Sequence, residues 1–254
     1  MKLVNPIIGC LLACLLLIVW TLGSCKKEVS DSLSTQDEKQ ANFTATESHV
    51  EADGVFNGIF DDALGVNNQV ALGGTGLFMR RGDGSSYTLR TDPAPACLNV
   101  VIAAAGTTND PFPITITLDF AGGCPGADGH VRKGKIMIKY LHRLIQPGSS
   151  ASIEFQDFSI DSLAIGNGTK YTISNTGTDD KLQFTIDINA RLNKSNGDYT
   201  QWRSHKVITR TDGGTTGSPL DDVMQVEGNA SGQVKRSDVA VAWKAEITSP
   251  FIKR

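Results

Sequence analysis

The chain has 254 residues, with 24 Lys and Arg against 27 Asp and Glu, which gives a net charge of −3 at pH 7. The basic residues are spread along the chain, which excludes the clustered basic face that nucleic-acid-binding proteins present to phosphates. Gly is abundant and aromatic residues make up 7% of the chain, a composition that favours a globular protein of short strands joined by many turns.

The N-terminus has the layout of a secretory signal peptide. Lys2 supplies a small charged region, and an apolar run follows from Ile7 to Trp20. The next segment, Leu22-Gly23-Ser24-Cys25, resembles a bacterial lipobox, in which an aliphatic residue and two small residues precede an invariant Cys. This resemblance implies that residues 1–24 are removed and that Cys25 is acylated on its sulfur and on its new amino group. The alternative is an ordinary signal peptide followed by a coincidental cysteine.

The expected lipid on Cys25 is the predicted means of membrane attachment. Each buried CH₂ of an acyl chain contributes about 0.8 kcal/mol, so two or more chains attach a protein firmly. After Cys25, no apolar run approaches the roughly 18–20 residues that a membrane-spanning helix requires. We therefore expect an outer-membrane lipoprotein of a bacterial cell envelope, and the sequence leaves open whether it faces the periplasm or the cell surface.

A polar segment and then a helix follow the cysteine. Residues 26–43 are charged and aperiodic, which predicts that 25–43 is a lipidated Cys with a flexible tether. Thr44-x-x-Glu47 and Ser48-x-x-Glu51 are capping boxes that predict a helix start, and Gly65 suits its end. Apolar residues recur between these signals at helical spacing. They are Val50, Val55, Phe56, Ile59, Phe60, Ala63 and Leu64.

The rest of the chain alternates between apolar and polar residues with a period of two, which is typical of antiparallel strands with one buried face. Turn sequences such as Gly122-Gly123 and Asn196-Gly197 separate these segments. Residues 44–254 are thus predicted to form one mainly β domain, an antiparallel sandwich or a curled sheet, with one N-terminal amphipathic helix. The apolar rows are Ile114–Phe120, Ile136–Tyr140, Phe184–Leu192 and Val239–Ile247.

Five cysteines are present, and two of them remain once the N-terminal region is set aside. Cys10 and Cys14 belong to the predicted signal peptide, and Cys25 is the predicted lipid acceptor. In an exported protein the remaining pair, Cys97 and Cys124, is more often bridged than free, so a disulfide is expected. The alternative is two buried thiols. Without a nearby pair of histidines, a zinc site is not expected.

No arrangement of residues predicts catalysis, a metal site or a cofactor. Gly129–Ile136 nearly matches the P-loop, but Ile136 replaces the hydroxyl that would hold Mg²⁺ and the following residues alternate as a strand. The four histidines lack metal-binding spacing, and no G-x-S-x-G sequence occurs. Acidic pairs such as Asp61-Asp62 are explained by solvated turns or a helix end.

Two aromatic residues near a turn are candidates for ligand stacking. Tyr199 and Trp202 follow the Asn196-Gly197 turn. Trp202 could stack on a sugar ring of an envelope glycan, with Tyr199 beside it, although a Trp beside a turn more often covers a sheet edge.

The block Ile116–Ile136 resembles a group of uncharacterised lipoproteins of the Bacteroidota, which carry an I-x-x-D-F-G…C…D-G-x-x-R-x-G-x-I pattern. Ala121 departs from that pattern, which has Gly at this position. The resemblance implies an exported lipoprotein and no particular activity. Members of the group continue with further strands and another Cys, which leaves open whether Arg254 is the natural end of the chain.

Two Asp-Ser-Leu triplets are similar to the O-glycosylation acceptor of that phylum. Ser32 lies in the predicted tether and is the better candidate, whereas Ser162 is expected within a strand.

These observations lead to three functional hypotheses. The first is a lipid-anchored, non-enzymatic binding or structural module of the envelope, with a glycan or protein partner and no cofactor. The second is a carrier that holds a lipid or another apolar ligand inside a curled sheet. The third is a hydrolase whose site is built from loops.

Overall fold

The computed structural model describes residues 35–72, 79–81, 87–89, 96–126, 128–214, 222–237 and 239–253. The chain divides into two compact units, Met1–Lys39 and Gln40–Arg254, and the contacts described below lie in the second. The predicted signal peptide, the lipidation of Cys25 and the glycosylation of Ser32 fall outside the described residues.

One long helix precedes the strands. The elements are α2 (Thr35–Gly65), β1 (Met79–Arg81), β2 (Tyr87–Leu89), β3 (Asn99–Ala104), β4 (Ile114–Asp119), β5 (Cys124–Pro125), β6 (Val131–Tyr140), β7 (Ser150–Ile160), β8 (Leu163–Ile165), β9 (Lys170–Asn175), β10 (Gln183–Lys194), β11 (Tyr199–Asp212), β12 (Val223–Arg236), β13 (Val239–Glu246) and β14 (Phe251–Lys253).

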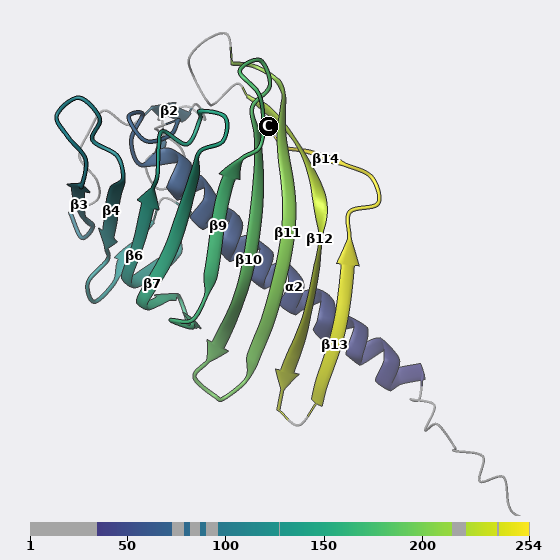
Figure 1. Cartoon of the computed structure of the whole chain (residues 1–254). Coiled ribbons are helices and arrows are strands. Elements are labelled where there is room, and N and C mark those ends of the chain that lie inside the picture. The colour runs from purple at the N-terminus through teal and green to yellow at the C-terminus, as the bar shows by residue number, and fades with distance from the viewer. Residues whose placement is uncertain are drawn as a thin grey trace, which may run out of the picture. The chain divides into compact units, whose positions relative to one another are not determined.

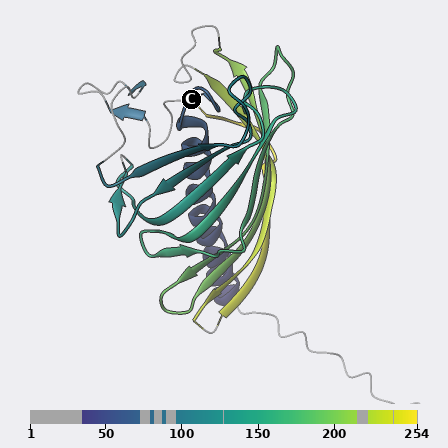
Figure 2. The ribbon, with the colours of Figure 1, turned by 60° about the vertical axis from the view of Figure 1, so that its left-hand side comes forward.

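The strands from β3 onward form one 12-stranded antiparallel sheet, and β1 pairs separately with β2. The order β13-β12-β11-β10-β8-β7-β6-β4-β3 follows the sequence, so most neighbours in the sheet are neighbours in the chain; β5, β9 and β14 pair beside this path. The sheet curls, and α2 lies against its concave side (Figures 1 and 2). The predicted mainly β fold with one helix is confirmed as a curled sheet.

The alternating rows pack as the sequence predicts, except on β13. Ile116 of β4 lies opposite Ile138 of β6, which in turn lies opposite Ile153 of β7, and all three are buried. In the row that begins at Val239, alternate residues of β13 are half-buried at best. The reason is that β13 ends the strand path and has one neighbouring strand, β12.

The helix begins at Thr35 rather than at Thr44, so residues 35–43 are helical and the tether predicted over 25–43 is too long. Thr44 and Ser48, expected as caps, lie inside the helix with buried side chains, and the Ser48 hydroxyl donates to the carbonyl of Ala45 at 2.8 Å. Val50, expected on the buried face, is 63% exposed. Apolar periodicity misses this half of the helix because its inward positions include small polar residues.

Two buried tyrosines of the sheet attach to the helix backbone. The hydroxyl of Tyr140 on β6 donates to the carbonyl of Ala63 at 2.6 Å, and that of Tyr171 on β9 donates to the carbonyl of Phe56 at 3.0 Å. Burial raises the pKa of both phenols, so they remain neutral donors at ordinary pH. These bonds hold α2 at a defined position along the sheet.

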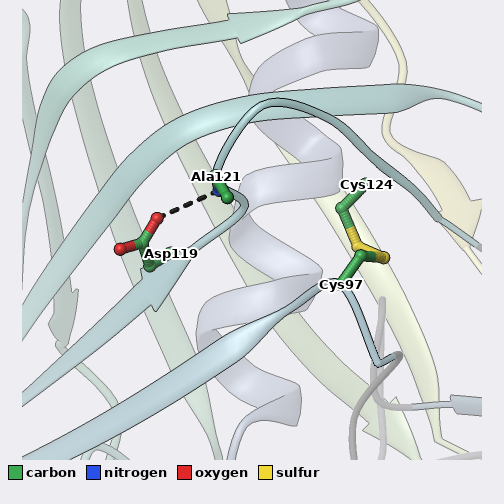
Figure 3. Close-up of a disulfide and its surroundings, with 4 residues drawn as sticks. All are labelled: Cys97, Asp119, Ala121 and Cys124. Carbon is green, nitrogen blue, oxygen red and sulfur yellow. Dashed lines mark hydrogen bonds between the residues drawn. A yellow bond between two sulfur atoms is a disulfide. The ribbon is translucent and has the colours of Figure 1, made fainter.

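The predicted disulfide is confirmed. Cys97 and Cys124 are joined with their Cα atoms 5.3 Å apart (Figure 3). The bridge connects the segment before β3 to β5, which pairs with β6. It therefore closes the loop between β4 and β6 against the start of the sheet.

Ala121 lies in that loop with a φ of +46°. Its N–H donates to Asp119 Oδ1 at 3.0 Å (Figure 3). A non-glycine residue in the left-handed region costs roughly 1–2 kcal/mol, and glycine loses about 0.5–1 kcal/mol of that gain through chain entropy. Ala121→Gly should thus stabilise the fold by about 0.5–1 kcal/mol, measured as a higher urea midpoint with an unchanged slope.

The matched control is Ala242→Gly on β13, where φ is not positive. That change should destabilise slightly, since glycine weakens a strand without relieving any strain. A loss of stability in both variants would contradict the strain at Ala121.

Candidate binding cleft

Of the two predicted stacking residues, Trp202 is buried and Tyr199 is half-buried. Trp202 on β11 is 0% exposed and stacks on Phe56 of α2, with ring centroids 5.3 Å apart and planes within 5°. Tyr199 is half-buried, and the guanidinium of Arg191 lies 3.8 Å from its ring centroid. The stacking role predicted for Trp202 is therefore wrong, because this ring belongs to the interface between helix and sheet.

Close to Trp202, a cleft of about 100 Å³ lies between α2 and strands β11 to β14. Its polar lining comes from the helix and three strands. These residues are His49, Asp53, Ser204, Lys206, Asn229 and Glu246. Its apolar lining consists of Ala230, Ala245, Ile247 and Phe251.

Gly228 on β12 sets the close spacing of the strands below the cleft. It pairs with Lys206 and has a φ of +147°. A Cβ at this position would lie 2.3 Å from the carbonyl oxygen of His205, closer than side chains tolerate. Its carbonyl also accepts a hydrogen bond from the N–H of Ile247 at 2.9 Å. The absence of a side chain here lets β12 approach β11, and the bond to its carbonyl holds Ile247, which lines the cleft.

Lys206 is the charged group at the base of the cleft, and it is 6% exposed. Its ammonium donates to Asp53 Oδ1 and, at 2.9 Å, to Asn57 Oδ1. The amide of Asn57 donates to Asp53 Oδ2 at 2.8 Å. Two helix residues one turn apart thus compensate and orient one strand lysine, as the burial of a charge requires. An ammonium has three N–H donors, so this network leaves one for the cleft.

His49 lies beside this pair and is held in its neutral form. Its Nδ1 accepts a hydrogen bond from Trp202 Nε1 at 3.3 Å, and its ring centroid lies 5.0 Å from that of Trp243. Burial lowers the pKa of His49; the charge of Asp53 opposes this effect, and that of Lys206 adds to it. Because Nδ1 is an acceptor, the neutral ring carries its proton on Nε2 and offers that N–H as a donor.

The lowered pKa predicts a pH dependence of stability. Unfolding restores the pKa of His49 to its ordinary value of 6.5. The unfolded chain therefore binds a proton at His49 more readily than the folded protein does. The contribution of neutral His49 to the free energy of unfolding is complete above pH 6.5. It is lost as the pH falls from 6.5 through the lower pKa of the folded state. His49→Gln keeps an acceptor for Trp202. The urea midpoint of this variant should change less between pH 5 and 7 than the midpoint of the parent protein.

The charged neighbours in the cleft, Asp53, Lys206 and Glu246, are unchanged in His49→Gln. The exposed His142, which is outside the cleft lining, provides a control, because His142→Gln leaves His49 and its surroundings unchanged. The lowered pKa values of Asp119, Asp128, Asp161 and Asp198 lie below the ordinary 3.8 and act at more acidic pH. If the urea midpoint of His49→Gln changed with pH as much as that of the parent, the pH dependence could not be assigned to His49.

A second buried charge lies where the C-terminal half of α2 meets β6. Arg132 is 2% exposed and donates to both carboxylate oxygens of Asp128, at 3.0 and 2.8 Å. Its Nε lies 3.7 Å from Asp62 Oδ2 on the helix. Burial opposes the charged form of Arg132, but the bonds to Asp128 and the charges of both carboxylates outweigh it and raise the pKa. Asp62 is thus a buried partner of the sheet, not a solvated residue at a helix end.

Two His–Asp pairs lie on exposed surfaces. His130 contacts Asp161 and His205 contacts Asp187, each through Nδ1 at 2.7 Å. Ser162 follows Asp161 in an exposed turn between β7 and β8, not within a strand as expected. Across the described ranges, no three His, Cys, Asp or Glu side chains are grouped to hold a metal ion.

Residues 131–136 of the P-loop-like segment belong to the strand β6, so this part of the segment is a strand, as its alternation predicts. In the part of the chain that the structure describes, no helix combines the length and apolarity that crossing a bilayer requires. The chain matches no family model, no curated protein and no solved structure. The site is therefore interpreted from its own chemistry.

Sequence reasoning missed His49, Asp53 and Lys206. A signal was nevertheless present, because the inward residues of β11 alternate in register with Trp202. They are Thr200, Trp202, Ser204, Lys206 and Ile208. Polar residues at three of these positions predict polar partners on whatever packs against the strand.

Proposed function

We propose that this chain is a lipid-anchored protein of the bacterial cell envelope whose β domain is a non-enzymatic binding module, with the cleft as its binding site. The observation that carries the proposal is the pairing of Lys206 with Asp53 beside a neutral His49. Both Lys206 and His49 keep a hydrogen-bond donor for a ligand after their contacts within the protein are made. A polar, preorganised base within a partly apolar cleft is the usual construction of a ligand site.

This proposal is favoured over the carrier hypothesis by the position of α2. The helix covers the concave side of the sheet, and its buried residues Phe56, Ile59 and Phe60 belong to the core. An apolar ligand held there would have to displace them.

The loop-built hydrolase has less support than the binding module. His130 and His205 form their Asp pairs on exposed surfaces, away from the cleft lining. His49 is close to a carboxylate in the cleft, but its lowered pKa makes it a weaker base than an ordinary histidine.

The anchor is supported by the lipobox-like segment at Leu22–Cys25 and tested separately from binding. Cells expressing the full chain are grown with an alkyne-labelled fatty acid, and the protein is then coupled to a dye. We expect labelling and membrane fractionation to be lost in Cys25→Ala and kept in Cys14→Ala, which changes a cysteine of the predicted signal peptide. A Cys25→Ala protein that retains the label would overturn the anchor.

The binding module is tested by native mass spectrometry of the mature lipoprotein, extracted in detergent and mixed with fragments of bacterial envelope glycan. We expect a 1:1 adduct that is weakened in Phe251→Ala, which removes an exposed side chain of the cleft. Ile252→Ala provides the control, because Ile252 is a neighbour of similar exposure outside the cleft lining. Adduct formation that is insensitive to Phe251 would place binding elsewhere.

A further inference from the structure

We infer that the cleft binds a neutral, hydroxyl-rich ligand, and that this ligand is a single sugar residue at the end of a glycan. The inference rests on the proposed function and specifies the ligand class of the same site. Three properties of the cleft carry it: its charge balance, its mixture of donors and acceptors, and its size.

The charge balance disfavours an ionic ligand. Lys206 is compensated by Asp53, and His49 is neutral, so the base of the cleft carries no net charge. The remaining charged residue of the lining, Glu246, is exposed, and an ion pair with an exposed carboxylate contributes little. A carboxylate or phosphate ligand would compete with Asp53 for Lys206, and an ammonium ligand would compete with Lys206 for Asp53. Either would leave one charge poorly compensated in a largely buried place. A neutral polar ligand avoids this penalty.

The hydrogen-bonding groups suit hydroxyls. His49 Nε2–H and the third N–H of Lys206 are donors, whereas the carboxylate of Glu246 is an acceptor and Asn229 can serve as either. Adjacent hydroxyl groups on one edge of a sugar each donate and accept, so a single ring can satisfy donors and acceptors together. A neutral amide side chain presents one carbonyl and one NH₂ group and satisfies fewer of them.

The apolar residues supply a wall for the C–H face of the ring. Ala230, Ala245 and Ile247 form part of this wall, and Phe251 on β14 is 47% exposed. A sugar ring has the same division into a polar edge and an apolar face. Phe251 thus takes the role that the sequence suggested for Trp202.

The volume limits the ligand to one unit. A cleft of about 100 Å³ is well below the roughly 300–1,000 Å³ of pockets that enclose drug-sized molecules. One sugar residue can enter in part, and the remainder of a glycan would extend into solvent past Phe251.

The test uses the mature lipoprotein in detergent and ligand-observed NMR titrations. The probes are the methyl glycosides of glucose, galactose and mannose as neutral ligands, methyl glucuronide as an anion, glucosamine as a cation, and acetyl-asparagine amide as a neutral amide. We expect at least one neutral glycoside to bind and the charged probes to bind at least about tenfold more weakly. Phe251→Ala should weaken the neutral glycoside about tenfold, and Ile252→Ala less than about twofold.

A second pair of variants tests the polar rim. Glu246→Gln should weaken the neutral glycoside, whereas Glu227→Gln, on the exposed surface of β12 and outside the cleft lining, should not. Both Glu residues are exposed, so neither variant should fail to fold.

The outcomes separate this inference from the proposed function. Preference for methyl glucuronide, glucosamine or acetyl-asparagine amide, with sensitivity to Phe251→Ala, would overturn the neutral-sugar inference and leave a binding cleft. If no probe binds and envelope glycan fragments give no adduct sensitive to Phe251, both the inference and the binding function of the cleft fall.

Discussion

Replacing Trp202 by alanine is expected to destabilise the protein by about 3–5 kcal/mol, the range for truncating a large buried aromatic side chain. Trp202 is completely buried, stacks on Phe56 and donates its indole N–H to His49. Its loss would leave a cavity between α2 and β11 and would remove the donor from Nδ1 of the half-buried His49. Urea unfolding followed by circular dichroism measures the change.

Two other substitutions control this result. Trp202→Phe keeps an aromatic ring against Phe56 and should recover part of the stability, because only the hydrogen bond and some area are lost. Trp243→Ala removes a half-buried ring from β13 at the end of the strand path and should cost clearly less. If Trp202→Ala instead abolished ligand binding at unchanged stability, Trp202 would be a ligand platform after all.

Replacing Arg132 by methionine is expected to cost about 3–5 kcal/mol, the range for removing one partner of a buried ion pair. Arg132 stands between Asp128, which it binds through two hydrogen bonds, and Asp62, which is 1% exposed. Methionine preserves much of the packing volume, so the loss measures the charge more than a cavity. The free energy of unfolding in urea at neutral pH gives the value.

The controls separate burial from charge. Lys135 lies on the same strand and pairs with Asp119 at 3.2 Å on the surface, so Lys135→Met should cost less than about 1 kcal/mol. The double variant Arg132→Met with Asp62→Asn should recover much of the loss, because the buried carboxylate is gone. Equal losses in Arg132→Met and Lys135→Met would show that the Arg132 pairs contribute no more than surface pairs.

Much of the sheet could be predicted because its strands carry a simple pattern. In Phe184–Leu192 every second side chain is apolar and buried, and the residues between them are polar and less buried. The same holds for Ile114–Asp119. Where one face of a strand is apolar and the other is exposed to solvent, alternation alone identifies the strand and its inward side.

The cleft could not be predicted in this way, because both faces of β11 carry polar residues. Ser204 and Lys206 point toward the helix, while Arg203 and His205 point away. Lys206 can face inward because Asp53 and Asn57 lie opposite it on α2. The pattern of β11 indicates that its inward polar residues need polar partners, but it does not indicate that those partners lie about 150 residues earlier in the chain.

The position of α2 also imposes an order on folding. The strands pair mostly with neighbours in the chain, so hairpins such as β10–β11 need contacts over short separations and can form early. The helix is different, because the Tyr171 bond to Phe56 spans 115 residues and the Trp202 bond to His49 spans 153. During synthesis α2 emerges before the strands that cover it, and the surroundings of Phe56 are complete only when Tyr171 and Trp202 have been made. A newly made chain therefore exposes apolar helix surface during part of its synthesis, and surface of this kind makes incompletely folded chains prone to aggregation.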